Sequence, residues 1–146
     1  MSRAIMLACT CTVIGLAAGA LSHLAGSSYL ETFLDANLLV VLIALMAINT
    51  TTVSVILTKM REIADAHPDV DFASTRRSMR AATLEQLVLI VVAAILLAAK
   101  GSPWLPAHVP HAAFVITSLL IAVFAYALQV LFDTAKAVYV ILDHGQ

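Results

Sequence analysis

The sequence predicts an all-α fold, a polytopic membrane protein whose four transmembrane helices form one bundle. Composition is the first reason, because 62% of the 146 residues are hydrophobic and only 12% are charged. Soluble domains average about 45–50% apolar and about 25% charged residues. The second reason is a set of four apolar stretches that reach or approach the ~20 residues needed to cross ~30 Å of hydrocarbon. The third is that Lys and Arg gather on one side of these stretches.

The four apolar stretches are the predicted spans. They cover about residues 4–25, 36–58, 82–99 and 112–132. A helix satisfies its own backbone groups, which hydrocarbon requires. Membrane-barrel strands would instead alternate apolar and polar residues, and these stretches are apolar on every side. No linker or repeat marks a boundary, so residues 1–146 form one predicted domain.

The first stretch has two interpretations. Arg3 precedes an apolar run that ends in small residues, a pattern that also describes a signal peptide. The run is longer than the ~7–15 residues of a signal core, which favours a retained span. Cleavage would leave three spans and an unchanged topology for the rest.

Three helices are expected to extend beyond the hydrocarbon core on the cytoplasmic side. Gly and Pro are absent from residues 59–67, 72–99 and 112–143, so helices can continue there. A helix of ~30 residues is ~45 Å long at 1.5 Å per residue, which exceeds the hydrocarbon by ~15 Å. These long helices should therefore tilt or project as a short stalk.

Small residues line one face of the first span. Gly15 and Gly19 form a GxxxG motif, which Ser22 and Gly26 extend along nearly the same face. Small residues let helix backbones approach closely in lipid. This face is predicted to pack either on another span of the same chain or on another subunit.

The second span contains a polar residue that is energetically costly to place in hydrocarbon. Ser and Thr hydroxyls can bond to a carbonyl one turn back, but the amide of Asn49 needs a partner on another helix or water in a cavity. Asn49 is therefore predicted either to join helices by hydrogen bonding or to line a pore with Thr52, which shares its face.

A polar stripe is predicted on the last helix, where Tyr126, Gln129, Asp133 and Lys136 recur at helical spacing. Gln129 is the second candidate for an intramembrane or pore-lining amide, and Asp133 can pair with Lys136. Glu85 lies at a similar depth on the third helix. The stripe is expected to face the bundle interior, or else to serve conduction or ligand sensing.

A basic cluster of Arg76, Arg77 and Arg80 lies beside the third span. Each such charge is worth ~1 kcal/mol near an anionic leaflet. The cluster therefore predicts contact with the lipid bilayer, or alternatively a docking site for an acidic cytoplasmic protein. No motif for nucleic-acid binding accompanies it.

The sequence predicts no catalytic, cofactor-binding or metal-ligating residues, and hence no enzyme. His108 and His111 are close in sequence, but Pro110 intervenes and no further ligand type lies near them. The leading functional prediction is a self-associating, homo-oligomeric membrane protein that forms pores or perturbs membranes. The alternatives are an accessory or scaffold subunit that docks a cytoplasmic partner, and a small transporter.

The positive-inside rule predicts the orientation. Arg3 precedes the first span, five basic residues separate the second span from the third, and Lys136 follows the fourth, whereas the other two connections hold only Lys100. Both termini are therefore expected in the cytoplasm, in a plasma or inner membrane. The connections over residues 26–35 and 100–111 are expected outside.

Cysteine labelling tests this orientation. The chain would carry Ser74→Cys and have its native Cys9 and Cys11 replaced by alanine. We expect a membrane-impermeant maleimide to label position 74 only after the cells are opened, because that position belongs to the cytoplasmic connection. Labelling of intact cells would contradict the topology.

Overall fold

The computed structural model describes residues 2–66, 72–102 and 111–143. The regular elements in these ranges are four helices: α1 (Ser2–Leu24), α2 (Tyr29–Ala66), α3 (Ala73–Lys100) and α5 (Ala112–Asp143). Each of the four is long and apolar enough to cross a membrane. The all-α class and the four candidate spans that the sequence predicts are therefore present.

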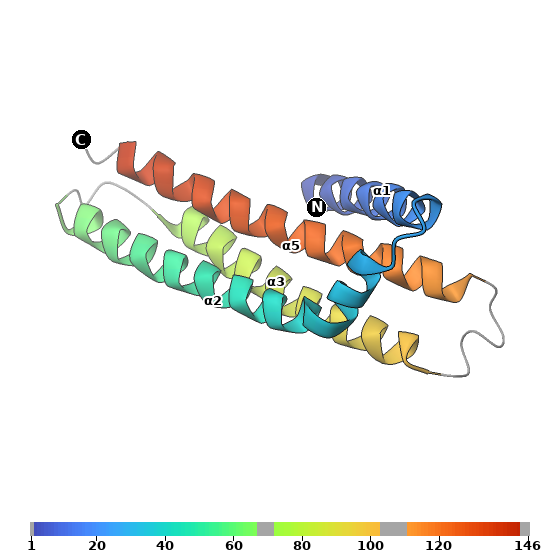
Figure 1. The fold of residues 1–146 in the computed structure, drawn as a ribbon. Helices are drawn as coiled ribbons and strands as arrows, with labels where there is room; N and C mark the ends of the chain where they lie inside the picture. Colours follow the sequence, from blue (N-terminus) through green and yellow to red (C-terminus); the bar gives the residue numbers. More distant parts are fainter. Residues whose placement is uncertain (1, 67–71, 103–110, 144–146) are drawn as a thin grey trace.

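Successive helices run in alternating directions along the bundle (Figure 1). The C-terminal ends of α2 and α5 lie together with the N-terminal end of α3, and the opposite ends lie together at the other end of the molecule. α5 packs against all three other helices, and α2 also packs against α3. α1 lies along α5, which makes it the most peripheral helix.

The main core lies where α2, α3 and α5 meet. Its buried residues are Leu34, Leu38, Leu42, Ala93, Ile116, Leu120, Ile121, Val123 and Ala127. Large apolar side chains also cover the outside of the bundle, among them Val40, Ile43, Val88 and Ile95. An apolar exterior of this kind fits a hydrocarbon surrounding, because soluble proteins rarely expose large contiguous apolar surfaces.

Buried side chains recur every seven residues on the facing sides of α2 and α3. The repeating positions are Leu42, Asn49 and Ile56 on α2, and Met79, Gln86 and Ala93 on α3. A seven-residue repeat keeps one side of a helix facing its partner, as in a coiled coil. We call this contact the α2–α3 seam. A second cluster extends it toward the end of α2, where Ile56 and Met60 pack with Met79.

α2 begins about two turns before the predicted span, at Tyr29, and reaches Ala66. Its 38 residues correspond to a length of ~57 Å at 1.5 Å per residue. Residues 29–35 therefore belong to α2 and not to the connection that the sequence predicts over residues 26–35, although Glu31 and Asp35 are charged. Both carboxylates are instead paired with Lys100, so the helix can include them.

Gly15 and Gly19 lie directly against α5. A Cβ added to Gly15 would overlap the backbone carbonyl oxygen of Ser118 and come within 2.9 Å of the Ala122 nitrogen. A Cβ added to Gly19 would come within 2.5 Å of the Ser118 hydroxyl oxygen. The two glycines thus allow the α1 and α5 backbones to approach closely, and their face is used within the chain.

Gly26 does not extend this contact. A Cβ at Gly26 would meet no atom within 4 Å, and the residue has a φ of +63°. The Ser27 amide donates a hydrogen bond to the Ser22 carbonyl, which completes the Schellman motif that commonly ends a helix at glycine. Gly26 therefore terminates α1, a role that sequence spacing alone does not reveal.

Gly15→Ala is expected to loosen α1 more than Gly19→Ala does. The new Cβ at position 15 meets fixed α5 backbone, whereas at position 19 the nearest atom is a hydroxyl that can rotate. Overpacking of this kind costs ~1–3 kcal/mol. Denaturant unfolding of the full chain in detergent measures the loss, with Val13→Leu on the exposed side of α1 as control. Equal stability of Gly15→Ala and the control would contradict the close contact.

Candidate functional site

The Asn49 amide is fully buried in the α2–α3 seam. Its Nδ2 donates a hydrogen bond to Gln86 Oε1 at 2.8 Å, and the exposed fractions of the two residues are 0% and 3%. Asn49 Oδ1 and Gln86 Nε2 have no hydrogen-bond partner in the structure. Oδ1 is a hydrogen-bond acceptor and Nε2 is a hydrogen-bond donor. The buried pair can therefore form further hydrogen bonds inside an otherwise apolar contact.

The hydroxyls between positions 50 and 58 of α2 are satisfied by their own helix. Thr52 donates to the Ile48 carbonyl oxygen at 2.9 Å, and Thr51 donates to that of Ala47 at 3.0 Å. Thr50, Ser54 and Thr58 make the same bond one turn back. Thr52 is partly buried, and its hydroxyl does not join Asn49 in a shared polar group.

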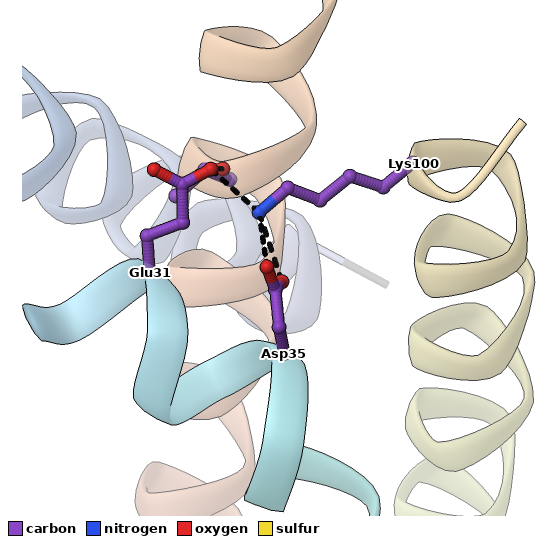
Figure 2. Close-up of polar contacts among 4 residues, drawn as sticks. Glu31, Asp35 and Lys100 are labelled. Carbon is purple, nitrogen blue, oxygen red and sulfur yellow. Dashed lines mark hydrogen bonds and ion pairs between the residues drawn. The ribbon is translucent and has the colours of Figure 1, made fainter. Parts of the chain in front are cut away.

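An ion cluster ties the other end of the seam (Figure 2). Lys100 Nζ lies 2.8 Å from Glu31 Oε1 and 2.8 Å from Asp35 Oδ2. The Lys100 side chain is only 14% exposed, so its ammonium depends on these carboxylates for the solvation it has lost. Thr117 of α5 adds a longer contact to Glu31 Oε1 at 3.5 Å.

The amide pair and the ion cluster share one register. Asp35 precedes Asn49 by two heptads on α2, and Lys100 follows Gln86 by two heptads on α3. The two contacts are therefore ~21 Å apart along the helices at 1.5 Å per residue. Both are made at once only when α2 and α3 are antiparallel with this alignment.

A pocket of about 510 Å³, with a lining that is more apolar than polar, lies beside the ion cluster, where α1 ends and α2 and α5 begin. Its polar lining consists of the side chains of Ser22, Ser27, Ser28, Glu31, His111 and Thr117. Leu30, Phe114 and Ile121 form its apolar lining. Of the predicted packing face, Gly19, Ser22 and Gly26 all border this pocket.

The predicted stripe on α5 makes contacts within and between helices. Tyr126 Oη donates to Glu85 Oε2 at 3.4 Å. Gln129 Nε2 donates to Asp133 Oδ1 at 3.3 Å. Lys136 is exposed, whereas Gln129 and Asp133 are partly buried. The structure therefore brings Glu85 to the stripe through Tyr126.

The basic cluster lies on the N-terminal turns of α3, where Arg76, Arg77 and Arg80 are all exposed. On the neighbouring end of α2, Lys59 Nζ pairs with Glu62 Oε2 at 2.6 Å. In the part of the chain that the structure describes, no group of three or more His, Cys, Asp and Glu side chains is placed to hold a metal ion.

Sequence reasoning identified Asn49 as needing a partner but not Gln86 as that partner. Gln86 follows the more conspicuous Glu85, and only the heptad spacing from Met79 to Ala93 marks it as inward-facing. The same spacing would have led from Asn49 to Asp35 and from Gln86 to Lys100. Ser118 was also missed, although it is 2% exposed and lies against Gly19.

Asn49→Leu is expected to lower the free energy of unfolding by ~1–3 kcal/mol, because it leaves the Gln86 amide buried without a partner. Asn49→Leu combined with Gln86→Leu should recover most of that loss, since both polar groups are then removed. A double-mutant cycle in detergent measures the coupling. Thr51→Ala, on the exposed side of α2, serves as the control, and strictly additive losses would contradict the pairing.

No family model matches the chain, and neither a curated protein nor a solved structure matches it. The function is therefore inferred from the chain's own side chains and their contacts.

Proposed function

We propose that the protein is a non-enzymatic, multi-pass membrane scaffold that docks an acidic cytoplasmic protein at the end of its α2–α3 hairpin where α3 begins. The supporting observation is that this end is packed. Ile56, Met60 and Met79 form a buried cluster, with Val53 and Phe72 against it. The last turns of α2 and the first turns of α3 are thus held together, which lowers the ordering cost of binding there.

The charged side chains on the surface of this hairpin end favour an acidic partner. Arg76, Arg77 and Arg80 are exposed on it, while Lys59 and Glu62 on α2 neutralise each other. Arginine favours carboxylate groups because its planar guanidinium can donate two parallel hydrogen bonds. In the orientation predicted by the positive-inside rule, this surface faces the cytoplasm.

The contacts of Asn49 favour a scaffold over a pore. A pore lined by Asn49 and Thr52 would need both side chains to face water. Asn49 is instead fully buried against Gln86, and the Thr52 hydroxyl is bonded to its own helix. Self-association stays a prediction, and it would have to use a face other than Gly15 and Gly19, which contact α5.

Photo-crosslinking in living cells tests the scaffold. A benzophenone amino acid replaces Ser78, which is exposed among the three arginines, or Val88, which is exposed on the apolar part of α3. We expect a protein adduct from position 78 and none of that mass from position 88. Changing all three arginines to Gln should abolish the adduct, and changing them to Lys should weaken it, because Lys keeps the charge but cannot donate two parallel hydrogen bonds to a carboxylate.

Two results would contradict the scaffold. One is an adduct that forms equally well after the three Arg→Gln changes. That result would show that the arginine charges do not contribute to binding of the partner. The other is single-channel conductance of the purified chain in planar bilayers that Asn49→Leu abolishes, which would place Asn49 in a conduction path.

A further inference from the structure

The pocket between α1, α2 and α5 stands apart from the hairpin end to which the scaffold function is assigned. Its volume of about 510 Å³ falls within the ~300–1,000 Å³ typical of small-molecule sites. One part of its lining is polar, with Glu31, His111 and the hydroxyl of Thr117, and another part is apolar, with Phe114 and Ile121. A ligand that fits both parts carries a polar group and a short apolar portion.

The ion cluster sets the charge of that polar group. Glu31 and Asp35 bring two negative charges, and within the described residues their ion pairs involve only the single positive charge of Lys100. The cluster thus carries one excess negative charge. Asp35 does not line the pocket, but Glu31 does, and the Glu31 side chain is 45% exposed.

We propose that this pocket binds a small organic ammonium ion. Its N–H groups donate to the Glu31 carboxylate and to serine or threonine hydroxyl oxygens, and its carbon chain packs on Phe114, Leu30 and Ile121. The cation compensates the excess charge in a partly desolvated position, where a charge pair is stronger than in water. This inference does not depend on the scaffold function.

An anion is the competing occupant. The first turns of α2 and α5 border the pocket, and the unpaired N–H groups at helix N-termini attract anions. Glu31 already lies in the first turn of α2 and offsets the positive end of that helix dipole. The charge balance therefore favours the cation, and the experiment compares the two directly.

Calorimetric titration of the full chain in uncharged dodecyl maltoside micelles tests the proposal. The probes are butylammonium, 1-butanol and butanoate, which share a chain length and differ in charge. We expect saturable binding of butylammonium alone. Glu31→Gln should weaken it by roughly tenfold or more, because a hydrogen bond to a charged group is lost. Glu62→Gln, which removes a carboxylate near the other end of α2, should leave binding unchanged.

A second variant leaves the ion cluster intact. Ala113 is exposed and lines the pocket, so Ala113→Phe should fill it and abolish butylammonium binding. Ala20→Phe, on an exposed position of α1 outside the pocket, is the matched control. This pair decides the question even if Glu31→Gln disturbs folding through Lys100.

The source of the ammonium is resolved by adding phosphatidylethanolamine to the micelles. Displacement of butylammonium assigns the site to a lipid headgroup, and no displacement assigns it to a soluble amine. Equal binding of butanoate or 1-butanol would overturn the proposal. So would butylammonium binding that neither Glu31→Gln nor Ala113→Phe changes.

Discussion

Hydrocarbon offers no hydrogen-bond partner to a polar side chain, so a polar group inside a span must be satisfied by the protein itself. In this chain that constraint applies above all to the polar side chains in the α2–α3 seam. Asn49 finds its partner in Gln86, and Lys100 finds Glu31 and Asp35. Shifting either helix by one turn would separate the Asn49 and Gln86 amides, at a cost of several kcal/mol for unpaired buried groups. The polar contacts therefore fix one alignment, which the heptad of apolar residues alone would leave less defined.

The rest of the bundle builds on this hairpin. α5 packs against α2 and α3 through apolar residues such as Leu120 and Ala127, and α1 then packs on α5. The α1–α5 contact depends on a different kind of interaction. Gly15 and Gly19 bring two backbones together, and association of this type in lipid rests on close packing rather than on hydrophobic burial. α1 is accordingly the helix whose position is most sensitive to added side-chain volume.

Much of the fold was predictable because each helix is marked by a long apolar run that is followed in the sequence by Gly or Pro. Partners were harder to predict. The sequence indicates that the Asn49 amide needs a hydrogen-bond partner, but it does not show which of several polar residues is that partner. Glu31 and Asp35 lie in the predicted connection over residues 26–35, but the structure includes them in α2. Their pairing with Lys100 is a three-dimensional contact that the sequence does not reveal.

Disulfide cross-linking measures the alignment of the seam most directly. Leu42 and Ala93 are buried in the same core cluster and occupy facing positions of the heptad repeat. In a chain with Cys9→Ala and Cys11→Ala, we expect Leu42→Cys to cross-link with Ala93→Cys under mild oxidation in native membranes. Cross-linking to Leu89→Cys or Leu97→Cys, one turn away on either side, should be much slower. Faster cross-linking of either shifted pair would contradict an α2–α3 seam set by Asn49–Gln86 and Asp35–Lys100.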